Sequence, residues 1–147
     1  MPRDPFLAAA IEQARKSLAE GGIPIGSVLV HDGKIIGRGH NCRVQTGSAI
    51  DHGEMNCLRN AGRLAAGVYR QCTIYSTLSP CPMCSGAIVL YKIPRVVVGE
   101  NRTFLGAEDY MRANGVDVQV VQDDECIELM TKFIRVHPQL WNEDIGV

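Results

Sequence analysis

This sequence of 147 residues has no long hydrophobic run, no surplus of positive charge and no Pro- or Gly-rich linker. No stretch reaches the ~18 consecutive apolar residues of a membrane span, so we expect no membrane partner. Fifteen basic side chains stand against 16 acidic ones, which gives a net charge of −1. That balance excludes a polyelectrolyte tail and lacks the basic excess typical of nucleic-acid binders, so we also expect no nucleic-acid partner.

We also expect no export signal. The N-terminal apolar run is short and is interrupted by the acidic residues Asp4 and Glu12, unlike the layout of a signal peptide. We therefore expect a cytoplasmic protein with reduced cysteines. No repeat or low-complexity segment divides the chain, and its length suits one compact domain over residues 1–147.

Hydrophobic periodicity and turn residues predict alternating helices and strands. A helix begins at Pro5, with Asp4 as N-cap, and ends at Gly21-Gly22, and a β-hairpin (23–30 and 34–41) turns around His31-Asp32-Gly33. The later predicted elements are a helix over 52–64, a strand over 73–77, a helix over 82–92, a strand over 95–100, a weak helix over 108–113, a strand over 116–121 and a helix over 123–136. This order predicts an α/β fold, a three-layer α/β/α sandwich around one mixed five-stranded sheet. In that sheet the hairpin is antiparallel and the later strands are parallel.

Three potential metal ligands occur in two segments, each at the start of a predicted helix. His52 opens the helix over 52–64, and Cys81 and Cys84 form a Cys-x-x-Cys pair where a strand turns into the next helix. One imidazole and two thiolates are a common zinc set, and three protein ligands leave a fourth position for water, whose pKa zinc lowers to about 7. The sequence therefore predicts a catalytic zinc site.

Glu54 follows His52 by two residues, which point about 200° apart on a regular helix. It is therefore a poor fourth ligand, but a carboxylate beside the zinc site is placed to take a proton from water and pass it to a leaving nitrogen. His-x-Glu followed by Pro-Cys-x-x-Cys is the signature of zinc deaminases that act on nucleobases. The alternative, a structural zinc site, needs a fourth ligand, for which His40 and Cys57 are the candidates nearby in the sequence. The cysteines outside the pair are interpreted as small buried hydrophobes, namely Cys42, Cys57, Cys72 and Cys126.

From about Gly21 to Gly146 the sequence resembles the fungal-type cytosine deaminases of the cytidine deaminase superfamily. The resemblance is carried by GGIPIGSVLV, GRGHN, GSAIDHGE, AGRL, YSTLSPCPMCSGAI, IPRVVVGEN and WNEDIG. It implies a homodimeric hydrolase of C–N bonds that converts the free base cytosine to uracil and ammonia in pyrimidine salvage. It also implies one Zn²⁺ per subunit, held by His52, Cys81 and Cys84, with Glu54 as the proton shuttle. The substrate-binding residues that it implies are Asn41, Gly53, Phe104, Trp141, Asp144 and Ile145.

Some features leave alternatives open. Val44 stands where the family has an aromatic pocket residue, Asp51 where it has an aliphatic one, and Asn142 replaces an aromatic. Isocytosine or another small aminated base is therefore an alternative substrate. The segment over 141–145 is either part of the pocket or a terminal helix docked by Trp141, and the apolar segment over 82–91 either faces a partner subunit or packs under the sheet.

Two further alternatives change the class of function. A tRNA adenosine deaminase shares the zinc motifs, but the chain shows no Lys/Arg-rich face, and we interpret Arg43, Arg63 and Arg102 as solvated surface residues. A non-enzymatic zinc-stabilised binding module predicts a closed site with four ligands and no ammonia from any base.

Overall fold

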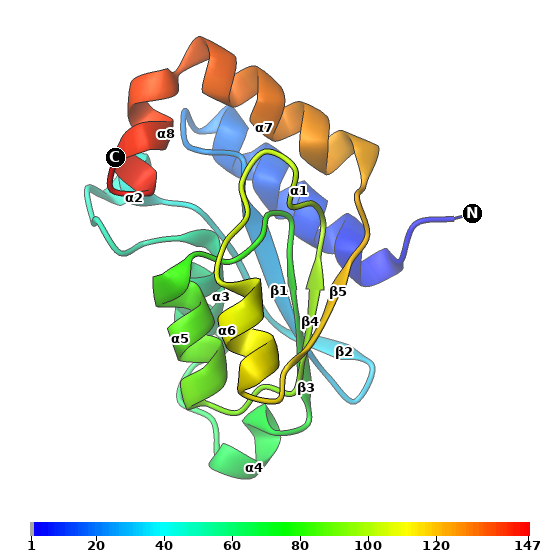
Figure 1. Ribbon diagram of the computed structural model, residues 1–147. Coiled ribbons are helices and arrows are strands. Elements are labelled where there is room, and N and C mark those ends of the chain that lie inside the picture. The colour runs from blue at the N-terminus through cyan, green and yellow to red at the C-terminus, as the bar shows by residue number, and fades with distance from the viewer. Residues whose placement is uncertain (1) are drawn as a thin grey trace.

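Figure 1 shows the computed structural model, which describes residues 2–147. The strands are β1 (Gly26–His31), β2 (Lys34–His40), β3 (Cys72–Ser76), β4 (Arg95–Val98) and β5 (Asp117–Val120). The helices are α1 (Pro5–Ala19), α2 (Arg43–Thr46), α3 (Gly53–Ala61), α4 (Ala66–Tyr69), α5 (Pro82–Leu90), α6 (Glu108–Ala113), α7 (Asp124–Val136) and α8 (Pro138–Asp144). Within residues 2–147, no helix is long and apolar enough to span a membrane.

The strands form one mixed sheet in the order β2-β1-β3-β4-β5. β1 pairs antiparallel with both β2 and β3, whereas β3, β4 and β5 run parallel to one another. The turn between β1 and β2 has positive φ angles at Asp32 (51°) and Gly33 (71°), the two-residue geometry that suits the twist of a hairpin. The predicted mixed sheet is therefore confirmed, with an antiparallel hairpin and parallel later strands.

Helices cover both faces of this sheet (Figure 1). Along β1, Val28 and Val30 pack on one face with residues of α1 and with Cys126 of α7. Leu29, which points the other way, packs with residues of α3, α5 and α6. This alternation follows from the two-residue period of a strand, and burial on both faces gives the predicted three layers.

The structure differs from the predicted elements in one helix end and two short helices, and it shows which form the C-terminal segment takes. The helix predicted over 52–64 ends at Ala61, because Gly62 adopts a positive φ of 88° and stops it. α2 and α4 were not predicted, because four residues are too few to show a helical period. The C-terminal segment is helical, with Trp141 of α8 buried against Met130 and Phe133 of α7.

Gly26 fixes the approach of α1 to the sheet. A Cβ atom at this position would lie 2.0 Å from the carbonyl oxygen of Ala10 and 2.5 Å from the amide nitrogen of Ala14. Because both atoms belong to backbone, they cannot move aside as a flexible side chain can. Only glycine therefore permits this contact between α1 and β1.

We expect Gly26→Ala to lower the free energy of unfolding by about 2 kcal/mol, the usual cost of overpacking. Urea denaturation of the zinc-loaded protein measures the change. Gly67→Ala is the matched control, because Gly67 is exposed in α4 and a Cβ there meets nothing within 4 Å. Equal stability of the two variants would contradict the close packing of α1 on β1.

Candidate active site

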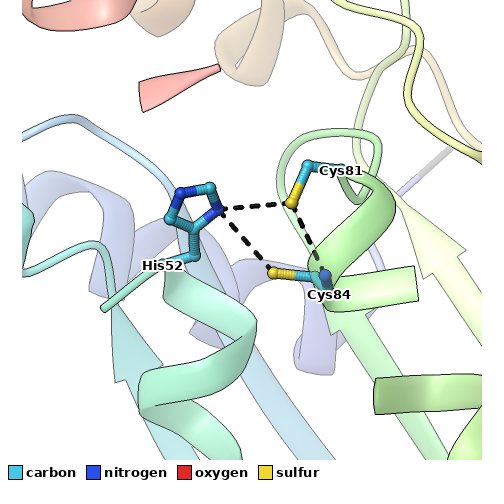
Figure 2. Close-up of side chains that lie close together, drawn as sticks. All are labelled: His52, Cys81 and Cys84. Carbon is cyan, nitrogen blue, oxygen red and sulfur yellow. Dashed lines mark hydrogen bonds between the residues drawn. The ribbon is translucent and has the colours of Figure 1, made fainter. Parts of the chain in front are cut away.

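The three predicted metal ligands lie together at the starts of α3 and α5 (Figure 2). Nδ1 of His52 is 3.4 Å from Sγ of Cys81 and 3.8 Å from Sγ of Cys84, and all three ligand atoms lie within 4.8 Å of one another. His52 is the N-cap of α3, and Cys81 is the N-cap of α5, where its sulfur accepts from the backbone N–H of Cys84 at 3.5 Å. Pro82 at the first helical position fixes the start of α5.

The charges of this cluster show how the ligands interact. Hydrogen bonds from the Cys84 thiol and from His52 lower the pKa of Cys81 to about 4, and the Cys84 pKa rises well above its usual range because Cys84 donates to Cys81 and is buried. Burial lowers the pKa of His52, but the hydrogen bond to Cys81 and the charge of Asp144 outweigh it and raise the pKa to about 9. The cluster thus holds protons that a divalent cation displaces when it binds.

The donor set fits zinc. One imidazole nitrogen and two sulfurs within contact distance of a common point are ligands that Zn²⁺ takes in tetrahedral sites. The two candidate fourth ligands are both engaged elsewhere. His40 contacts Gln13 and Glu20, and the thiol of Cys57 donates to the carbonyl oxygen of Gly37. Across residues 2–147 the ligand group therefore has three members and not the four of a closed structural site.

Glu54 is buried in the first turn of α3, beside the ligand cluster. Burial, followed by the negative charge of Cys81, raises its pKa to about 7. A cation on the three ligands lowers this pKa again, because it favours the carboxylate. With the cation bound, Glu54 is therefore held as the carboxylate, the form that can accept a proton from water.

A small cavity adjoins the ligands and Glu54. Its free volume is about 10 Å³, room for a single water molecule. Phe104 and Trp141 close one side, with ring centroids 5.5 Å apart at an angle of 82°. The lining residues are Ile25, His52, Glu54, Leu78, Ser79, Cys81, Phe104, Trp141, Asp144 and Ile145.

Asp144 of α8 links the cavity to the end of β2. Nδ2 of Asn41 donates to Oδ1 of Asp144 at 2.8 Å, and the same oxygen lies 3.5 Å from Nε2 of His52 and 3.8 Å from Nη1 of Arg43. Burial raises the pKa of Asp144, although the charge of His52 and the Asn41 hydrogen bond oppose this. A carboxylate facing the second nitrogen of a metal-binding histidine orients the ring.

Not every predicted substrate residue reaches the cavity. Phe104, Trp141, Asp144 and Ile145 line it, but Asn41 contacts it only through Asp144. The space beside the Gly53 Cα is filled, because a Cβ there would lie 3.2 Å from the carbonyl oxygen of Ile25. Gly53 itself does not line the cavity, although His52 and Glu54 on either side of it do.

Three lining residues, Ile25, Leu78 and Ser79, were not predicted. Ser79 stands two residues before Cys81 at the turn into α5, which is the only sequence feature that points to it. For Ile25 and Leu78, the sequence pattern indicates only ordinary core residues.

The three departures from the family pattern lie outside the cavity lining. Val44 is 43% exposed and faces a separate groove that Leu140 and Glu143 of α8 also line. Asp51 is buried, and its carboxylate binds Arg59 together with two neutral donors of the same region. Asn142 is exposed on α8.

Comparison with known proteins decides the family. Residues 2–100 match the model of the cytidine and deoxycytidylate deaminase zinc-binding region. The chain belongs to this deaminase family. A cytosine deaminase of Candida albicans is 58% identical over 95% of this chain and 94% of its own length, and a tRNA-specific adenosine deaminase of Streptococcus pyogenes is 46% identical over 88% of each chain. The match confirms the predicted family and, with the ligand set, the predicted zinc cofactor.

Solved structures of the deaminase family agree with the fold. A structure from work on A-to-I editing by tRNA:A34 deaminases superposes with a TM-score of 0.75 at 28% identity. The superposition covers 86% of this chain and 99% of the other. The predicted cytidine deaminase-like architecture is thereby confirmed.

Removal of zinc should expose one fast-reacting thiol. Cys81 is the one partly exposed cysteine of the six, and its lowered pKa keeps it a thiolate at pH 7. We expect zinc-loaded protein to resist a thiol reagent and chelator-treated protein to react at one site per chain, as measured by mass spectrometry. Cys81→Ser should abolish this reaction and Cys42→Ser should leave it, so equally fast labelling of the zinc-loaded protein would contradict the ligand assignment.

Proposed function

We propose that this protein is a cytosine deaminase, which hydrolyses the free base to uracil and ammonia. The observation that carries the proposal is the cavity in which Glu54 faces a three-ligand zinc set and a buried Asp144. Hydrolytic deamination needs an activated water, a proton shuttle and a polar group for the base, and this cavity supports all three. The identity of 58% over 95% of the chain to the Candida albicans cytosine deaminase supports cytosine as the base.

The proposed chemistry assigns a task to each residue. His52, Cys81 and Cys84 would hold the zinc ion, which supplies a Lewis acid that makes water nucleophilic at neutral pH. Glu54 takes a proton from the attacking water and gives it to N3 of the base as the water oxygen bonds to C4. Glu54 then carries the second proton of that oxygen to the amino group, the C4–N bond breaks, and ammonia leaves.

The remaining cavity residues would bind the base and exclude bulk water. Asp144, held by Asn41, accepts from the amino group of the base, and the Gly53 amide donates to its edge. Phe104, Trp141 and Ile145 enclose the ring, which shields the proton transfers from solvent. A pyrimidine exceeds the present free volume of about 10 Å³, so some of the enclosing side chains must shift outward when it binds.

The positions of the three departures support cytosine over isocytosine. Val44, Asp51 and Asn142 all lie outside the cavity lining, so none of them widens the space that holds the ring. The net charge of −1 and the enclosure of the cavity by α8 also favour a small base over a tRNA, although tRNA-specific adenosine deaminases are among the relatives.

Ammonia release by the zinc-loaded protein tests the substrate. We expect faster turnover of cytosine than of isocytosine, cytidine, adenine or guanine, because the cavity shows no departure from the residues that the resemblance implies. A preference for isocytosine or a purine would change the substrate and keep the mechanism. If the zinc-loaded protein released ammonia from none of these bases, the proposed function would be contradicted.

Glu54→Gln tests the mechanism. We expect kcat for cytosine to fall by about 10²-fold or more, because the amide cannot carry a proton, while zinc content stays at the native level. Glu143→Gln, an exposed acid on the pocket helix α8, should keep native activity. Native turnover by zinc-loaded Glu54→Gln protein would show that Glu54 is not the shuttle.

We further propose that the protein is a homodimer joined through α5 and α6. The side of α5 that carries Cys84 and Ile88 packs on the sheet, but four large apolar side chains at the ends of α5 and around α6 stay exposed. These are Leu90 (66%), Tyr91 (45%), Leu105 (64%) and Tyr110 (48%). A second copy of the chain would cover this surface, and one part of the 82–91 segment would then face the sheet and another the partner.

Light scattering at micromolar concentration tests the dimer. We expect a dimer for the native protein and a monomer for Leu90→Lys, because a buried unpaired lysine opposes association. Val136→Lys is the control, because Val136 is similarly exposed (55%) but lies on α7 across the sheet. A native monomer, or a Leu90→Lys dimer, would contradict this interface.

A further inference from the structure

Two buried glutamates have no task in the proposed chemistry. Glu100 and Glu108 are 0% and 3% exposed, and they flank residues 101–107 of the loop between β4 and α6. This loop carries Phe104, which closes the cavity against Trp141. Glu108 begins the short helix α6, where a charged side chain ordinarily lies at the surface.

Glu108 binds the turn that precedes the zinc ligands. The hydroxyl of Ser79 donates to Oε2 of Glu108 at 2.6 Å, and the same hydroxyl accepts from the backbone N–H of Gly106 at 2.9 Å. Nδ2 of Asn101 lies 3.3 Å from both carboxylate oxygens, and Nη1 of Arg112 lies 3.5 Å from Oε1. One carboxylate therefore joins both ends of the Phe104 loop to Ser79.

The backbone completes this junction. The N–H of Ala107 donates to the carbonyl oxygen of Pro80, and the N–H of Ser79 donates to that of Glu100, each at 3.0 Å. Gly106 passes so close that a Cβ would lie 1.9 Å from the oxygen of Pro80. At the other end of the loop, the Glu100 carboxylate accepts from two backbone N–H groups, those of residues 102 and 103, at 2.8 and 3.0 Å.

The turn itself has a second anchor. The Ser85 hydroxyl of α5 donates to the carbonyl oxygen of Pro80 at 3.0 Å, and the Ser85 N–H donates to that of Cys81 at 2.8 Å. Loss of Glu108 therefore removes the side-chain link between the loop and Ser79 and leaves the turn with its zinc ligand in place. The position of the Phe104 loop therefore depends on the turn, whereas the turn is also held by α5.

We propose that Glu108 is a positioning residue that, through Ser79, fixes Phe104 against Trp141 and so sets the wall of the base pocket. It contacts neither the cavity nor the metal ligands, and it acts through the loop. Phe104 meets the ring in the ground state and in the transition state alike, so its displacement weakens binding more than it slows the chemistry. The kinetic consequence rests on the proposed deaminase function, whereas the structural consequence does not.

The single tryptophan of the chain reports this wall directly, because Trp141 is 6% exposed and contacts Phe104. In zinc-loaded Glu108→Ala we expect Trp141 emission to shift to longer wavelength and acrylamide to quench it more strongly. We expect KM for cytosine to rise about tenfold and kcat to change by no more than about threefold, with native zinc content.

Three matched variants separate positioning from simple destabilisation. Asp109→Asn removes an exposed acid next to Glu108 on α6 and should match the native protein. Ser79→Ala removes the bridging hydroxyl and should reproduce the Glu108→Ala fluorescence and KM, also where Glu108→Ala fails to fold. Glu108→Gln keeps an acceptor for Ser79 and should fall between the native protein and Glu108→Ala.

Native fluorescence and native KM in Glu108→Ala would overturn the proposal. So would a loss of zinc together with a fall in kcat as large as the rise in KM, because that result marks a structural role. If no base is deaminated, the Trp141 shift still tests the positioning role. Failure of the proposed function is thus distinguishable from failure of this inference.

Discussion

The structure depends on the meeting of two helix N-termini at one end of the sheet. α3 and α5 lie on the same face and begin side by side, so that His52 and the Cys81–Cys84 pair converge across them (Figure 2). Backbone N–H groups and the helix dipole at these termini favour anionic sulfur. A thiolate, an imidazole and the Glu54 carboxyl are costly to bury singly, and their mutual contacts offset that cost. Each ligand lies in or just before the first turn of its helix, where a bound cation can complete this set.

Sequence reasoning recovered what local patterns determine. The helical and strand periods indicated the α/β order, and the spacing of His52, Glu54 and the cysteine pair indicated the zinc chemistry. It could not show which side chains line the cavity, because that depends on contacts between distant segments. Ile25 follows α1, and Leu78 precedes the cysteine pair, yet both reach the same space. Val44, expected beside the substrate, faces an outer groove for the same reason.

The two covers of the cavity are held by different means. Phe104 sits in a loop joined to the zinc-ligand turn by the Ser79–Glu108 contact and by backbone hydrogen bonds at both ends. Trp141 sits in α8, a terminal helix of seven residues that packs on α7 and is tied to β2 through Asp144 and Asn41. Because a pyrimidine exceeds the present free volume, entry of the proposed substrate requires at least one of these two covers to move.

The way in which the cavity is covered also affects which size of substrate can enter. A nucleobase within a polynucleotide reaches a pocket only if the flanking backbone finds room and positive charge beside it. Here the chain's own C-terminal helix covers the cavity, and the Asp144 carboxylate on that helix faces inward toward Asn41 and His52. An attached nucleic-acid backbone would need to displace the helix that supplies this inward carboxylate. A free base needs much less room beside α8 and can lie next to Asp144 without displacing the helix backbone. The arrangement that encloses the cavity therefore also favours a small substrate that enters alone.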